Sequence, residues 1–312
     1  MNDDPRPSRK GFFTDTSVCI GCKACEVACK EWNSVPEDGL DFLASSFDNS
    51  GRLSADTWRH VAFVEQRLPL GHQEPGVGRP EGAAGGTAAA TGAGTGAGTV
   101  DLGMPSFDLP GQRAGDDDGT QGRGDFRWLM SSDVCKHCTS AACLDVCPTG
   151  ALFRTEFDTV VVQEDICNGC GYCVSACPYG VIDRREVDGR AWKCTLCYDR
   201  IGEGLEPACA KACPTDSIQF GDLDELRERA QRRVEDLHEA GVSSARLYGE
   251  DPDDGVDGAG AFFLLLDEPE VYGLPPDPVV TTRDLPSMWR HAGAAAMVLL
   301  AGGLAAFAGR RS

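Results

Sequence analysis

Residues 167–178 have the sequence CNGCGYCVSACP, in which two, two and three residues separate four cysteines and a proline follows. The same spacing occurs at 19–29, where Lys30 replaces the proline. Two further runs, at 135–148 and 194–214, lengthen one spacer to four and to eleven residues. We number the runs motifs one to four in chain order, and together they contain all 16 cysteines of the 312-residue chain. The motifs hold Cys19, Cys22, Cys25 and Cys29; Cys135, Cys138, Cys143 and Cys147; Cys167, Cys170, Cys173 and Cys177; and Cys194, Cys197, Cys209 and Cys213.

This spacing is typical of 4Fe–4S proteins. In bacterial ferredoxins the run Cys-x2-Cys-x2-Cys-x3-Cys-Pro supplies three ligands to one cluster, and its fourth cysteine ligates the other cluster of a pair. The last step, if helical, advances about 6 Å and reaches the neighbouring cluster. Gly21, Gly169 and Gly171 let the backbone approach the cluster sulfides. The sequence therefore predicts four 4Fe–4S clusters, with iron bound by the sixteen cysteines.

Two other uses of cysteine fit the pattern less well. Zinc ribbons contain two Cys-x2-Cys pairs, and motif four alone has that spacing. Three runs of the ferredoxin type in one chain argue against zinc, so a zinc-binding interaction module is a remote alternative. A disulfide framework is disfavoured because Cys-x2-Cys pairs have poor bridging geometry and the chain is not small.

The charge of the chain excludes one class of partner. There are 29 Lys and Arg against 49 Asp and Glu, a formal net charge of −20, whereas nucleic-acid binding needs basic residues in excess. Four oxidised clusters with their thiolates add about −8. Basic residues beside the motifs raise reduction potentials or guide a partner, or else they are ordinary solvated charge that offsets the clusters. They are Lys23, Lys30, Lys136, Lys193, Lys211, Arg184 and Arg185, with His137 as a candidate donor to a cluster.

The rest of the chain contains an insertion and some regular structure. Residues 35–127 contain no cysteine and include a low-complexity Gly/Ala/Thr-rich linker at 76–124. WRHVAFVEQ (58–66) is expected to be a strand. We expect hairpins within 152–163 and 181–193, the second turning at Asp188-Gly189.

The region after the motifs contains two expected helices. Apolar residues at three- and four-residue steps predict a helix over 222–240, with Asp222 as N-cap, and an acidic loop follows at 249–258. Residues 292–308 are 17 uncharged residues, and Arg310 and Arg311 lie beyond them. We predict a single transmembrane helix and basic tail over 287–312. A buried terminal helix is the alternative.

Four stretches resemble the iron–sulfur β subunit of membrane-associated formate dehydrogenases. They are GFFTDTSVCIGCKACEVACKEWN (11–33), SDVCKHCTSAACLDVCPTGAL (132–152), VCPTGALFRTEFDTVVVQEDICNGCGYCVSACPYGVIDRR (146–185) and AFFLLLDEPEVYGLPPDP (261–278). The resemblance covers about 11–34, 128–221 and 260–308, roughly two-thirds of the chain.

The resemblance implies an α+β fold of two ferredoxin-like modules with nested connectivity. Motifs one and four form one module (11–34 with 190–221), motifs two and three form the other (128–189), and 222–286 is a helix and partner-docking segment. It also implies the ligands of each cluster. These are Cys19, Cys22, Cys25 and Cys213 for cluster 1; Cys29, Cys194, Cys197 and Cys209 for cluster 2; Cys135, Cys138, Cys143 and Cys177 for cluster 3; and Cys147, Cys167, Cys170 and Cys173 for cluster 4.

The function implied by the resemblance is electron transfer without catalysis. The expected donor is a molybdopterin-containing catalytic α subunit, most readily a formate dehydrogenase, and the expected acceptor is a membrane cytochrome b γ subunit or quinone. Residues 1–10 lack the apolar run of a secretory signal. The family is exported together with its catalytic partner, which implies a membrane-anchored protein with its bulk on the extracytoplasmic side. A dimethyl sulfoxide or polysulfide reductase-like β subunit, a hydrogenase subunit and a free-standing polyferredoxin are alternatives.

Overall fold

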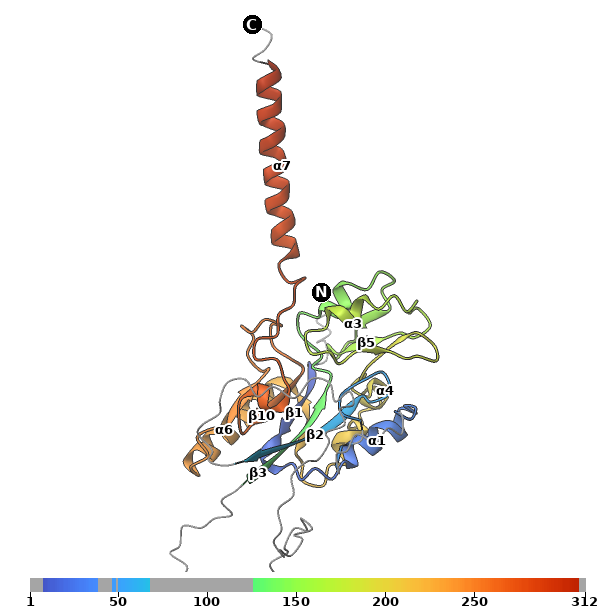
Figure 1. Ribbon diagram of the computed structural model, residues 1–312, viewed down its shortest axis with the longest axis vertical. Helices are drawn as coiled ribbons and strands as arrows, with labels where there is room; N and C mark the ends of the chain where they lie inside the picture. Colours follow the sequence, from blue (N-terminus) through green and yellow to red (C-terminus); the bar gives the residue numbers. More distant parts are fainter. Residues whose placement is uncertain (1–7, 39–46, 49, 68–125, 309–312) are drawn as a thin grey trace, which may run out of the picture. The chain divides into compact units, whose positions relative to one another are not determined.

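The computed structural model describes residues 8–38, 47–48, 50–67 and 126–308 (Figure 1). The linker expected at 76–124 lies outside the described residues. The contacts divide the chain into one unit of residues 1–64 with 128–312 and a second unit of residues 65–127. Of the second unit, only the ends of strands β2 and β3 are described.

A four-stranded sheet with the strand order β8-β1-β10-β9 organises the first unit. Its strands are β1 (Lys10–Asp15), β8 (Ile218–Asp222), β9 (Arg246–Tyr248) and β10 (Ala261–Leu265). Strand β1 pairs antiparallel with β8 and parallel with β10, so the first strand lies between two strands from the last third of the chain. All residues of β10 are buried, which accounts for an apolar run without alternation.

The two faces of the sheet have different roles. Phe13 packs on Phe262, with ring centroids 5.3 Å apart, in the core beneath α6 (Leu223–Glu239). Its neighbour Phe12 points the opposite way, into the core that contains buried cysteines such as Cys25. The helix predicted over 222–240 is confirmed as α6.

Asp222 occupies the N-cap position of α6 but makes no capping hydrogen bond. Its carboxylate instead accepts hydrogen bonds from Lys10, at 2.7 Å, and from Ser8. The predicted cap is therefore correct in position and wrong in function, because the carboxylate ties the end of β8 to the start of β1.

Short helices and hairpins surround the cysteines. The helices are α1 (Ala24–Trp32), α2 (Ala142–Asp145), α3 (Tyr172–Ala176), α4 (Tyr198–Gly202) and α5 (Ala208–Lys211), with the 3-10 helix η1 (Thr16–Val18) directly before Cys19 and a second one, η2 (Pro269–Tyr272), elsewhere. Both predicted hairpins are confirmed, as β4 (Leu152–Arg154) with β5 (Val160–Val162) and β6 (Asp183–Arg184) with β7 (Ala191–Trp192). The strand predicted at 58–66 is β2 (Arg59–Arg67), which pairs with β3 (Phe126–Val134).

The last helix, α7 (Leu285–Ala308), contains the predicted apolar run and begins seven residues before it. Its stretch Ser287–Phe307 is long and apolar enough to cross a membrane, and none of it is buried inside the described part of the chain. The alternative of a buried terminal helix therefore receives no support.

Candidate metal centres

Helices α1 and α5 pack together and bring motif one beside motif four. Burial raises the pKa of the Cys29 thiol well above its usual range. The negative charges of Cys194, Cys209 and Cys197 raise this pKa further, so these thiols are its neighbours. The Asn33 side-chain nitrogen lies 3.8 Å from the sulfurs of both Cys29 and Cys197. We call this group of four cysteines site 2.

The other cysteines of motif one lie around a separate cavity, which we call site 1. Its cysteines are Cys19, Cys22, Cys25 and Cys213. Burial raises the pKa of Cys19, and the charges of Cys213 and Cys22 add to the increase. Burial also raises the pKa of Cys25 to about 11, and its sulfur lies 3.2 Å from Ser132 Oγ. Site 1 thus takes three cysteines from motif one and one from motif four.

A cavity lies between motifs two and three, and we call it site 3. Its cysteines are Cys135, Cys138, Cys143 and Cys177. Burial raises the pKa of Cys138 well above its usual range and that of Cys143 to about 12. His137 lines the same cavity, and its Nδ1 accepts a hydrogen bond from the Val160 N–H at 3.1 Å. The proton of the neutral ring is therefore on Nε2, which is buried and has no acceptor among the described residues.

The remaining cysteines form site 4. Burial raises the pKa of Cys173 to about 11, and the charges of Cys167, Cys170 and Cys147 raise it further. The backbone N–H of Ala191 donates to the Cys167 sulfur at 3.4 Å. Burial alone would raise the pKa of Cys147, but hydrogen bonds from backbone N–H groups outweigh burial and lower it. Three cysteines of motif three thus lie near one cysteine of motif two.

Glycines shape the cysteine loops. Gly21 has a φ of +64°, and a Cβ on it would lie 2.6 Å from the Met130 sulfur. Gly169 has a φ of +72°, and its Cβ would lie 2.3 Å from the Gly189 carbonyl oxygen. Both backbone conformation and space therefore require glycine at these two positions. Gly171 also has a positive φ, +78°, but faces only ordinary contacts.

The donor set fits iron–sulfur clusters. All 16 cysteines are free thiols; seven are buried and seven are partly buried, so that neighbouring thiolates would repel each other and lose hydration. Bound iron supplies the positive charge that stabilises such thiolates. In the described ranges, no three His, Cys, Asp or Glu side chains lie close enough to hold a single metal ion, which is what a zinc site needs.

Two basic side chains beside the motifs are buried. Lys136 is 1% exposed and donates to Asp133, and its Nζ lies 5.1 Å from the Tyr179 ring centroid. Lys193 is 2% exposed and donates to the Cys194 carbonyl at 2.9 Å. The interpretation of ordinary solvated charge is wrong for these two lysines.

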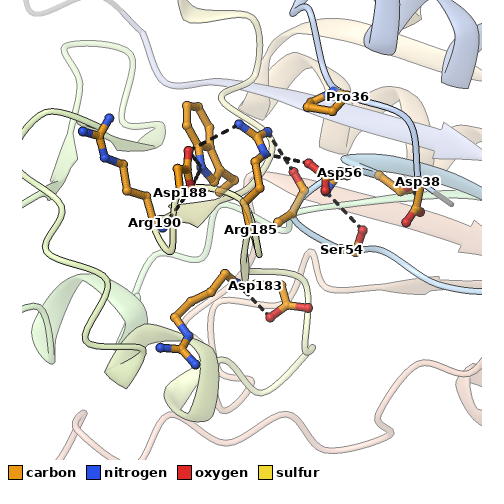
Figure 2. Close-up of polar contacts among 12 residues, drawn as sticks. Pro36, Asp38, Ser54, Asp56, Asp183, Arg185, Asp188 and Arg190 are labelled. Atoms are coloured by element: carbon orange, nitrogen blue, oxygen red, sulfur yellow. Dashed lines mark hydrogen bonds and ion pairs between the residues drawn. The ribbon is translucent and has the colours of Figure 1, made fainter.

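Arg185 has a structural role in the β6–β7 hairpin, which leads into motif four (Figure 2). Its Nε donates to Asp56 Oδ1 at 2.7 Å, and its guanidinium lies 3.8 Å from Asp188. The guanidinium carbon is 4.0 Å from the Trp192 ring centroid, and that ring stacks with Trp58 at 6.2 Å. These contacts join the β6–β7 hairpin to the segment that precedes β2.

Sequence reasoning did not identify Arg59, the first residue of β2. Arg59 is 2% exposed, and its Nη1 donates to Ser132 Oγ at 3.0 Å. The same hydroxyl contacts the Cys25 sulfur of site 1. The available signal was an arginine close to the apolar run VAFV (61–64) of the predicted strand, since a buried arginine needs a negatively charged neighbour.

Comparisons with known proteins agree with this geometry. Two family models, each described as a 4Fe-4S dicluster domain, match residues 18–151 and 126–223. The fold and the cysteine sites therefore define a 4Fe–4S dicluster protein with mixed helices and strands.

Curated relatives narrow the class. The iron–sulfur subunit of the nitrate-inducible formate dehydrogenase of Escherichia coli (strain K12) is 34% identical over 95% of this chain and 81% of that protein. The formate dehydrogenase iron–sulfur subunit of Haemophilus influenzae is 33% identical over 93% of this chain and 76% of that protein. A component of the anaerobic dimethyl sulfoxide reductase of E. coli is 31% identical over 70% of this chain and 76% of that protein. The chain belongs to the family of formate dehydrogenase iron–sulfur subunits.

Proposed function

We propose that this chain conducts single electrons through four 4Fe–4S clusters and catalyses no reaction itself. The observation that carries the proposal is that each of the four sites gathers three cysteines from one motif and one from another, the sharing found in two-cluster ferredoxins. The proposed ligands are Cys19, Cys22, Cys25 and Cys213 at site 1; Cys29, Cys194, Cys197 and Cys209 at site 2; Cys135, Cys138, Cys143 and Cys177 at site 3; and Cys147, Cys167, Cys170 and Cys173 at site 4.

The sites follow one another in the order 1, 2, 3, 4. Pairs of cysteines that interact electrostatically link consecutive sites: Cys25 with Cys209, Cys135 with Cys194, and Cys143 with Cys173. Of the sixteen cysteines, only Cys22 at site 1 and Cys170 at site 4 are exposed. The two ends of the proposed path therefore reach the surface, while the cysteines of its middle are buried or partly buried.

The clusters supply the one-electron chemistry, and the chain supplies binding, spacing and a dry environment. Buried Lys136 and Lys193 lie beside sites 2 and 3 and offset part of the negative charge there. The Nε2 proton of His137 points to a hydrogen bond with the group at site 3. These residues stabilise a reduced cluster without taking part in a bond-breaking step.

The partners follow from the relatives. We propose that a molybdopterin-containing catalytic subunit, most readily one that oxidises formate, delivers the electrons. A membrane cytochrome b or quinone receives them. The similarity to a dimethyl sulfoxide reductase component supports a reductase-type catalytic partner as the second candidate.

Helix α7 serves as the proposed membrane anchor, with the bulk of the chain on the extracytoplasmic side. Just before this helix, Thr282 Oγ1 donates to Asp145 Oδ2 at 2.7 Å. Asp145 lies between two ligands of the second motif, Cys143 and Cys147. The start of α7 is thus held beside sites 3 and 4, which supports site 4 as the exit for electrons.

The test is anaerobic purification of the full chain in its complex. Four clusters require about sixteen iron atoms per chain, a brown colour and co-purification of a large pterin-containing subunit. A colourless preparation that contains zinc would refute the proposal.

A pair of variants tests the ligand assignment within motif four. Cys209→Ser and Cys213→Ser alter cysteines four positions apart, yet the proposal assigns them to different clusters. We expect each variant to lose a different cluster signal in electron paramagnetic resonance. Loss of the same signal from both would show that motif four serves a single site.

A further inference from the structure

Arg59 is a buried cation for which the described residues contain no carboxylate partner. Its Nη1 donates to the carbonyl oxygen and the hydroxyl of Ser132, at 3.3 and 3.0 Å. Its guanidinium carbon lies 4.9 Å from the Phe12 ring centroid. Its Nε and Nη2 groups are buried and have no acceptor in the described parts of the chain. The N–H of Nε, the NH2 group of Nη2 and one positive charge are therefore left for another group to satisfy.

The groups that surround Arg59 are cysteines of two neighbouring sites. Burial alone would lower its pKa, but the charges of Cys209, Cys25, Cys194 and Cys29 outweigh burial and raise it. Cys25 belongs to site 1, and the other three belong to site 2. The guanidinium thus lies where the two sites meet.

We propose that Arg59 is a positioning residue for electron transfer, which raises the reduction potentials of the clusters at sites 1 and 2 through its charge and the unpartnered N–H donors of Nε and Nη2. The inference rests on the proposed function. Reduction adds one electron to a cluster that is already negative, so a fixed cation beside it stabilises the reduced form more than the oxidised form. Hydrogen bonds to cluster sulfur act in the same direction.

Two contacts explain why arginine is suited to this position. Its planar guanidinium lies over the Phe12 ring, which leaves the N–H groups at its edge free to donate. Ser132 holds one end of the guanidinium and also contacts the Cys25 sulfur, so it fixes the plane of the group relative to site 1. A purely structural arginine, which joins β2 to β3 through Ser132, would have no effect on potentials.

The experiment is a redox titration of the full chain in its complex, monitored by electron paramagnetic resonance, with iron content measured on the same samples. Arg59→Met keeps the length of the side chain and removes its charge. We expect full iron content and a reduction equilibrium constant about tenfold lower for two of the four cluster signals, or 59 mV for a one-electron couple. Arg59→Lys, which keeps the charge, restores most of the shift. The control is Arg246→Met, because Arg246 pairs with Glu268 and no cysteine; it leaves all signals unchanged.

Unchanged potentials in an iron-replete Arg59→Met chain would overturn the proposal. If that variant loses iron, Arg59→Gln replaces it, and the same two signals must shift. Loss of iron from both neutral variants would assign Arg59 to assembly alone and also overturn the proposal. Fewer than four cluster signals in the unaltered chain would instead count against the proposed function, so the two failures are distinguishable.

Discussion

Replacement of Gly169 by alanine tests how closely the cysteine loop of site 4 depends on its backbone. The left-handed conformation, with φ at +72°, costs a residue with a Cβ about 1–2 kcal/mol. The added Cβ would also lie 2.3 Å from the Gly189 carbonyl oxygen, a backbone atom that cannot move aside cheaply. Overpacking of this kind costs about 1–3 kcal/mol more.

Gly180→Ala is the matched control. Gly180 has a similar φ of +61°, but a Cβ there would meet nothing within 4 Å, so only the conformational cost applies. The difference between the two variants isolates the clash with Gly189. At about 1.4 kcal/mol per factor of ten, the clash corresponds to a roughly 5- to 140-fold difference between the two variants in the rate at which the cluster is lost.

The assay is the rate of loss of cluster absorbance in denaturant under anaerobic conditions, together with iron content. Gly169→Ala should lose the site 4 cluster first. Its cluster absorbance should disappear about 5- to 140-fold faster than that of Gly180→Ala. Equal rates and equal iron in the two variants would refute the reasoning.

Three further outcomes are expected. Phe262→Ala, in the core beneath α6, should destabilise the chain by about 3–5 kcal/mol in thermal unfolding, whereas Val187→Ala, which is 95% exposed, should change nothing measurable. Hydrogen bonds from His60 and from backbone N–H groups outweigh burial and hold the pKa of Asp48 below its usual value. A carboxylate with a lowered pKa stabilises the fold above its unfolded pKa, so Asp48→Asn should cost about 1 kcal/mol at pH 7, with the difference from the parent shrinking as the pH falls below about 4. Removal of iron by a chelator should raise hydrogen exchange in α2 and α3 before α6, because the core around those two short helices includes proposed cluster ligands such as Cys143 and Cys173, whereas the core beneath α6 consists of aliphatic and aromatic side chains.

Local features were predicted well from the sequence. The cysteine spacing, the Asp188-Gly189 turn and the periodic apolar positions of α6 each depend on residues close together in the chain. The structure confirms both hairpins and α6, because the signals for these elements are local turn chemistry and periodicity.

Long-range pairing was not predicted. Residues 10–15 were not assigned to a strand, since their partner β10 is about 250 residues away and nothing within the six residues specifies it. Strand β3 was missed for a similar reason, because its partner β2 precedes it across residues 68–125. Arg59 escaped notice because its importance depends on four cysteines drawn from motifs one and four.

The position of β1 between β8 and β10 has a consequence for biosynthesis. The ribosome makes β1 first, yet neither of its hydrogen-bonded neighbours exists until residues 218–222 and 261–265 have emerged. Motif one, which directly follows β1, therefore cannot take its final place during most of translation. Machinery that inserts metal must act on a nearly complete polypeptide. In a chain truncated before residue 261, strand β1 would lack its parallel partner β10.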